Sequence, residues 1–96
     1  MATYIVGQSN LRIELETGIT LTGNTCLIKY KKPNGVSGQW SATISTDVSK
    51  MYYDVTSSTD IDVAGKWIFW SHVTYGDGSI GKGHSATQYF YKEGDV

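Results

Sequence analysis

The sequence contains a single cysteine, Cys26, so the chain cannot form an internal disulfide, and the Cys-Trp-Cys pattern of antibody-type domains is absent. It contains no run close to the roughly 20 apolar residues that a membrane-spanning helix requires. Charge of one sign is not in excess either, because eight Lys and Arg residues oppose nine Asp and Glu residues, for a formal net charge of −1. We therefore expect a domain that is stabilised by packing alone and that binds neither nucleic acid nor a membrane.

Aromatic and β-branched residues are what this chain has in quantity. Its 96 residues include seven Tyr, three Trp and two Phe, with 40% hydrophobic and 18% charged residues overall. This composition favours strands over helices, and the length is that of one domain. We predict a single all-β domain over residues 1–96, in which residues 1–9 form a flexible or docking N-terminal arm.

Short alternating segments between turn residues give the strand prediction. Strands are expected at residues 4–6, 11–16, 26–31, 39–44, 51–55, 67–75 and 85–91. Regular spacing of this kind is typical of sandwiches and barrels. We predict a two-sheet antiparallel β-sandwich of about seven strands.

The segment 67–75 carries the strongest strand signal, because it lacks Gly and Pro and is rich in aromatic and β-branched residues. We predict that it is the central strand and that Trp67 lies in the core, as does Trp40. Pro33-Asn34-Gly35 is turn chemistry, since Pro fixes φ and Asn and Gly tolerate the positive φ that follows. It predicts a hairpin between the strands on either side.

Several short motifs resemble those of small virion proteins of tailed bacteriophages. These motifs are Leu21-x-Gly23, the strand that ends in Tyr30-Lys-Lys-Pro-Asn-Gly35, the strand of Trp40, and Ala64-Gly65-Lys-Trp67. Over residues 10–92 the chain is also similar to the N-terminal domain of the upper baseplate protein of phages that infect Gram-positive bacteria. The resemblance implies an immunoglobulin-like sandwich that serves as a building block of the virion.

A non-enzymatic structural role in the tail, baseplate or head-tail region is therefore expected, in a virion protein made in the host bacterial cytoplasm. Its partners would be other virion proteins, and copies of itself in the particle. Two alternatives stay open: a capsid decoration protein, and a carbohydrate-binding module for attachment to the host.

The sequence shows no coherent catalytic or metal-binding group. His72 and His84 lie in no known ligand spacing with each other or with Cys26, and we expect them at solvent-facing or edge positions. Asp60-x-Asp62 is a weak calcium signal, and capping of loops is the preferred interpretation of Asp54, Asp60, Asp62 and Asp77. Gly76-x-Gly78 and Gly81-x-Gly83 lack the helix that a dinucleotide site needs. We expect no enzyme activity, no cofactor and no metal.

Aromatic side chains and one lysine cluster are the remaining candidates for function. The candidates for a subunit interface or a flat platform for sugar rings are Tyr52, Trp70, Tyr75, Tyr89 and Tyr91. The alternative is that the second face of the sandwich buries most of them. Lys29, Lys31 and Lys32 form a possible basic contact patch, or else a solvated face that guards a strand edge against aggregation.

Overall fold

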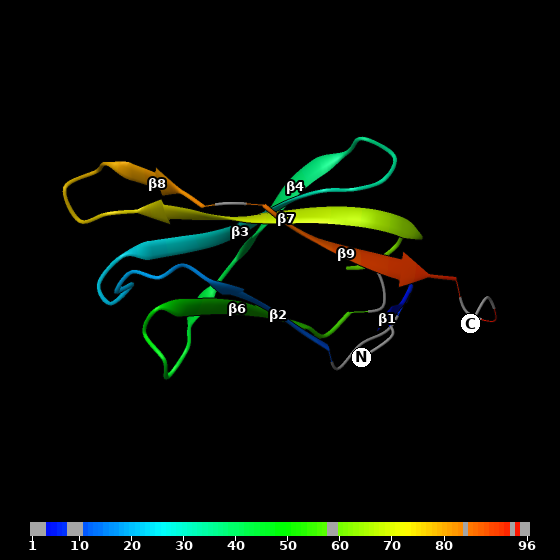
Figure 1. Cartoon of the computed structure of the whole chain (residues 1–96), viewed down its shortest axis with the longest axis horizontal. Coiled ribbons are helices and arrows are strands. Elements are labelled where there is room, and N and C mark those ends of the chain that lie inside the picture. Colours follow the sequence, from blue (N-terminus) through cyan, green and yellow to red (C-terminus); the bar gives the residue numbers. More distant parts are fainter. Residues whose placement is uncertain (1–3, 8–10, 58–59, 84, 93, 95–96) are drawn as a thin grey trace.

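The computed structural model describes residues 4–7, 11–57, 60–83, 85–92 and 94, and these residues form two β-sheets stacked face to face (Figure 1). The strands of sheet A lie in the order β1-β9-β7-β3-β4, with β8 also paired to β7, and those of sheet B in the order β2-β6-β5. Among these residues no helix is long and apolar enough to cross a membrane. The prediction of an all-β, immunoglobulin-like sandwich is confirmed.

The nine strands of the described residues have the following bounds: β1 Tyr4–Ile5, β2 Leu11–Glu16, β3 Thr25–Lys31, β4 Ser37–Ser41, β5 Thr43–Ile44, β6 Lys50–Val55, β7 Gly65–Thr74, β8 Ile80–Lys82 and β9 Ala86–Tyr91. Strand β7 is central, as predicted, because it pairs with β3 on one side and with β8 and β9 on the other. The hairpin at Pro33-Asn34-Gly35 also forms, with the Lys32 amide donating to the Val36 carbonyl at 2.8 Å.

Two details differ from the prediction. Strand β1 runs parallel to β9, with Tyr4 opposite Phe90, so the sandwich is not wholly antiparallel. The strand expected at 39–44 is divided at Ala42, whose amide donates to the Cys26 carbonyl at 3.0 Å. The chain leaves sheet A there and continues in sheet B as β5. This division, together with the short strand β8, raises the strand count from seven to nine.

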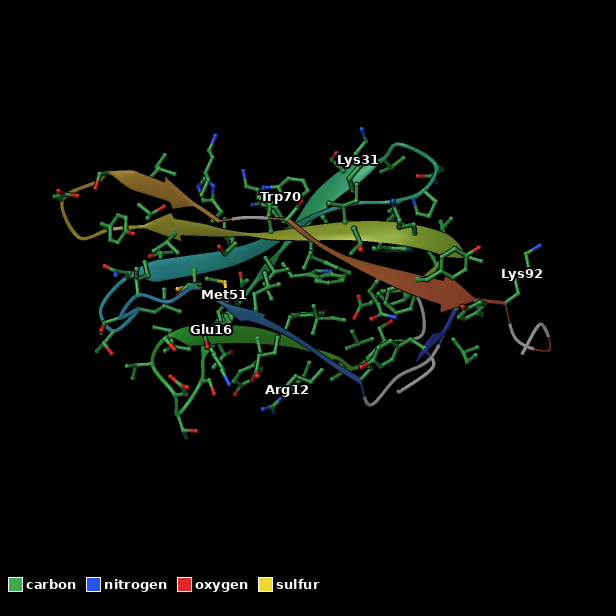
Figure 2. The ribbon with its side chains drawn as sticks, viewed as in Figure 1. Arg12, Glu16, Lys31, Met51, Trp70 and Lys92 are labelled. Carbon is green, nitrogen blue, oxygen red and sulfur yellow. The ribbon has the colours of Figure 1, made fainter. Side chains whose placement is uncertain are left out.

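Alternation along the inner strands builds the core between the sheets. Trp67 and Phe69 of β7 are buried, as are Ile28 of β3 and Phe90 of β9. From sheet B, Met51 faces them, and Figure 2 shows its side chain between the two sheets. The core placement of Trp67 is thus confirmed.

Trp40 joins the two sheets at the edge of this core. Its ring stacks on that of Tyr53 in sheet B at 4.5 Å between centroids and lies 6.4 Å from that of Trp67. It is partly buried and packed against the core, in agreement with its predicted role.

The described part of the predicted N-terminal arm lies against the domain itself. Tyr4 packs on Phe90 with ring centroids 5.9 Å apart, and the amides of Val6 and Gly7 donate to the carbonyls of Tyr91 and Ile61. Residues 1–3 and 8–9 of the arm lie outside the described residues.

Candidate binding face

The five aromatic candidates fall on three different surfaces. Trp70, Tyr89 and Tyr91 lie on the outer face of sheet A, because each alternates with a buried neighbour, and Figure 2 shows Trp70 projecting away from sheet B. Tyr52 lies on the outer face of sheet B, where the Arg12 guanidinium sits 3.8 Å above its ring. Tyr75 packs against the core. The structure therefore brings three of the five onto one face.

The three candidate lysines also separate. Lys29 and Lys31 alternate with buried Ile28 and lie on the outer face of sheet A. Lys32 belongs elsewhere, because its ammonium group pairs with Asp62 at 2.9 Å and lies 5.5 Å from the centre of the Trp67 ring. Lys32 therefore caps the end of the core and is not part of the contact patch that the sequence suggested.

Sequence reasoning missed two lysines that belong to the same face as Lys29. Lys66 begins the outward row of β7 and lies opposite Tyr89 of β9. The outward position of Lys66 could have been predicted by extending the alternation of the central strand back by one residue. Lys82 lies on β8 opposite His72. Its place depends on the register of the β7–β8 hairpin, which alternation within one strand does not reveal.

Together these side chains make one surface, which we call the basic face: Lys29, Lys31, Lys66, Lys82, His72, Trp70, Tyr89 and Tyr91. The cross-strand pairs interleave lysines with rings, since Lys29 lies opposite Trp70 and Lys66 opposite Tyr89. The rings of Tyr89 and Tyr91 lie 4.7 Å apart and are 50% and 36% exposed. Half of the eight basic residues of the chain are on this face.

Acidic residues are segregated from the basic face. The six strands of sheet A contain no Asp or Glu. The two long strands of sheet B carry Glu14, Glu16 and Asp54 on their outer face. The net charge of −1 therefore conceals a positive field over sheet A.

His72 sits in the middle of this positive field. Its Nδ1 atom is buried and has no hydrogen-bond partner among the described residues. Burial lowers the pKa of His72 below its usual 6.5, and the charges of Lys29 and Lys82 lower it further. Of the two positions expected for His72, the edge position is excluded, because β7 has neighbours on both sides, whereas its half-buried side chain lies on the outer face of sheet A. His84 lies outside the described residues.

The acidic candidates each have a separate structural partner. Asp54 binds the Arg12 guanidinium at 2.7 Å, Asp60 accepts a hydrogen bond from the Tyr53 hydroxyl at 2.9 Å, and Asp62 pairs with Lys32. Asp77 caps its turn as predicted, accepting from the amide and hydroxyl of Ser79. Within the described ranges no three His, Cys, Asp or Glu side chains come together as metal ligands would. The arrangement is suited to binding through charge and ring surfaces.

Comparison with known proteins gives information on the fold alone. No protein-family model matches the sequence, and no curated protein matches it. The structure is similar to the crystal structure of CopC from Methylosinus trichosporium OB3b, with a TM-score of 0.57 and 16% sequence identity over 100% of this chain and 90% of that chain. At this identity the likeness supports the β-sandwich and assigns no ligand or partner to this chain.

The comparison contradicts the interpretation as a tailed-phage virion module. The structural neighbour is not a virion protein, and nothing links the chain to phages. The motifs behind that interpretation have structural roles: Pro33-Asn34-Gly35 closes the β3–β4 hairpin, Leu21 is buried, and Gly65 begins β7 at a positive φ of 127°. Such turns and strand entries recur wherever a sandwich needs them, so they indicate the fold and not a place in a virion. The same correction removes the capsid-decoration and host-attachment alternatives.

Proposed function

We propose that this protein is a non-catalytic binding module that holds an acidic protein surface on its basic face. One observation carries the proposal: sheet A gathers four lysines, His72 and three outward rings on one side of the molecule, with no carboxylate in any of its strands. Surfaces that bind proteins are enriched in Tyr and Trp, whose rings supply contact area at low entropic cost. The lysines would steer a negatively charged partner and fix its orientation.

An acidic protein fits this surface better than a nucleic acid. Domains that bind nucleic acids are usually strongly basic overall, whereas this chain has a pI of about 6.0, and on the outer face of sheet B Glu14, Glu16 and Asp54 outnumber Arg12 and Lys50. A long polyanion would extend beyond the basic face and meet that negative field. A protein patch of limited size would not.

The absence of turnover in this proposal follows from the chemistry of the face. His72 is its one group able to exchange protons near neutral pH, and its neighbours Lys29 and Lys82 oppose its protonation. The carboxylates that would orient it as a general base lie on other surfaces. The lysines and rings bind without activating a nucleophile.

The test measures, by titration calorimetry, the affinity of the chain for a short poly-L-glutamate peptide, a probe small enough to stay within the basic face. Replacement of Lys29 and Lys66 by glutamate should abolish binding, because it reverses two of the four lysine charges of the basic face. The matched control replaces Arg12 and Lys50, which lie on the outer face of sheet B, by glutamate. It makes the same change of net charge away from the face and should retain most of the affinity.

Binding should also weaken as salt is added, since the contacts are exposed charges. Equal losses in the two double variants would mean that net charge, and not the basic face, determines binding. Tighter binding to a DNA duplex than to poly-L-glutamate would reject the choice of an acidic protein.

A further inference from the structure

Within the described part of the chain, strand β2 has no neighbouring strand on the side away from β6. Its six residues pair with β6, and of the residues that the structure describes no other strand pairs with it. An unpaired edge presents a row of backbone donors and acceptors that can bind another strand. This edge lies in sheet B, away from the basic face.

The register of sheet B shows which backbone groups point outward. The amide of Thr17 donates to the carbonyl of Ser49 at 2.9 Å, so the odd-numbered residues of β2 direct their backbone groups toward β6. The amide and carbonyl groups of Arg12, Glu14 and Glu16 therefore point away from it. They form a binding edge with one donor and one acceptor at every second residue.

Two of the usual protections of an edge, proline and an inward-pointing charge, are missing from β2. The side chains that point inward from β2 are all apolar, namely Leu11, Ile13 and Leu15, and the strand contains no proline. The charged side chains stand on the outer face of the sheet, where they leave the edge open. Beside the edge runs a groove, with hollows of about 260 and 520 Å³ that share Leu15 and Ala86 among their lining residues.

The geometry points to a second copy of this chain as the occupant: two β2 strands pair antiparallel across a two-fold axis. In such a pair, residue i of one chain lies opposite residue j of the other, and residue j lies opposite residue i. Only the even-numbered residues of β2 have backbone groups that point away from β6, so both members of each hydrogen-bonded pair must be even-numbered. The register centred on Ile13 places Arg12 opposite Glu14 of the partner subunit. Because of the two-fold symmetry, this ion pair forms twice in the dimer. It also places Leu11 opposite Leu15 of the partner subunit.

Charge selects this register over its neighbour. A shift centred on Glu14 would bring two glutamates into direct contact, whereas centring on Ile13 creates no like-charge pair between the described residues of β2. The free edge of β4 offers no such selection, because that strand is uncharged. A six-residue edge buries less than the roughly 1,600 Å² of a standard interface, so we expect dimerisation in the micromolar to millimolar range.

Sedimentation velocity over a concentration series up to the millimolar range tests the dimer. The wild-type chain should shift from monomer to dimer, and Arg12→Glu should weaken association about tenfold, because two ion pairs become two like-charge pairs. The double variant Arg12→Glu/Glu14→Arg should recover it. Lys66→Glu, which makes the same charge change on the basic face, should leave association unchanged. A wild-type chain that stays monomeric, or a Lys66→Glu loss equal to that of Arg12→Glu, overturns the proposal.

Disulfide trapping tests the register. Hydrogen-bonded cross-strand pairs have Cα atoms about 5.5 Å apart, which suits a disulfide, and buried Cys26 does not compete. An equimolar mixture of Arg12→Cys and Glu14→Cys chains should oxidise mainly to the mixed dimer. If the dimer of two Glu14→Cys chains predominates, the proposed register is wrong. If neither that dimer nor the mixed dimer forms, the pairing of the two β2 strands is wrong. Neither experiment depends on the basic face, so this proposal and the proposed function fail separately.

Discussion

At the scale of single residues, His72 shows how burial and charge act together. Its pKa is lowered first by burial and then by Lys29 and Lys82, so the folded chain binds this proton at a lower pH than the unfolded chain does. Stability from neutral His72 is therefore complete above the ordinary pKa of 6.5 and is lost as the pH falls from there through the lower pKa of the folded chain. We predict an NMR titration midpoint below 6.5 for His72, and a loss of unfolding free energy across this range.

The variant His72→Gln assigns the histidine signal and isolates its effect on stability. It should lose less stability than the wild type between neutral and mildly acidic pH, because the titrating group is gone. A wild-type midpoint above 6.5 would contradict both the burial of His72 and the positive field around it.

Trp67 and Lys31 give the sharpest contrast between the two faces of sheet A. Trp67 is fully buried and its Nε1 donates to the Val63 carbonyl at 2.8 Å, whereas Lys31 is exposed. We predict that Trp67→Ala costs about 3–5 kcal/mol of unfolding free energy and Lys31→Ala less than about 0.5 kcal/mol. Urea unfolding measures both, and equal midpoints would mean that the faces are assigned wrongly.

At the scale of elements, the β3–β4 hairpin depends on a glycine. A Cβ atom at Gly38 would lie 2.9 Å from Cε1 of Tyr30, whose ring is held by Trp40 at 4.6 Å and Trp67 at 5.4 Å between centroids. Because the ring cannot easily move, we predict that Gly38→Ala destabilises the fold by about 1–3 kcal/mol.

Gly76 is the matched control for Gly38. A Cβ atom at Gly76 meets nothing within 4 Å, and its φ is not in the left-handed region, so Gly76→Ala should be neutral or slightly stabilising. Thermal unfolding compares the two variants. Similar melting temperatures would show that the Tyr30 ring moves aside at little cost.

The same scale explains how much of the fold the sequence predicts. Strands β2, β6 and β7 were predictable because alternation of buried and exposed residues is a local property. The division at Ala42 was not, since residues 40, 42 and 44 keep one face to the core while the backbone changes sheets. Strand β8 has three residues and is defined by pairing with β7, which depends on the hairpin register.

The candidate site also combines features that a local sequence pattern predicts with features that depend on strand pairing. Trp70, Tyr89, Tyr91, Lys29 and Lys31 could be proposed singly from exposure and residue type. Their assembly into one face, and the inclusion of Lys66 and Lys82, required the cross-strand register. Lys32 is excluded from the basic face because it pairs with Asp62. That contact joins residues 30 positions apart, which no local pattern encodes.

At the scale of the whole molecule, the sandwich separates its charges by sheet. Sheet A is basic, and the outer face of sheet B carries the strand carboxylates. In the dimer inferred above, the two-fold axis is perpendicular to the joined sheet, so both basic faces point in the same direction. A partner with two acidic sites could then bind both at once, which would raise the apparent affinity without new contacts.

The most direct test of the basic face is a map of backbone amide shifts as poly-L-glutamate is added to the chain. The predicted changes are concentrated on the outward residues of β3, β7 and β8, with the largest at Lys29, Trp70, His72 and Lys82. The outer face of sheet B, at Tyr52 and Asp54, should stay unchanged. Changes centred on sheet B, or spread evenly over both sheets, would contradict the assignment of the binding surface to the basic face.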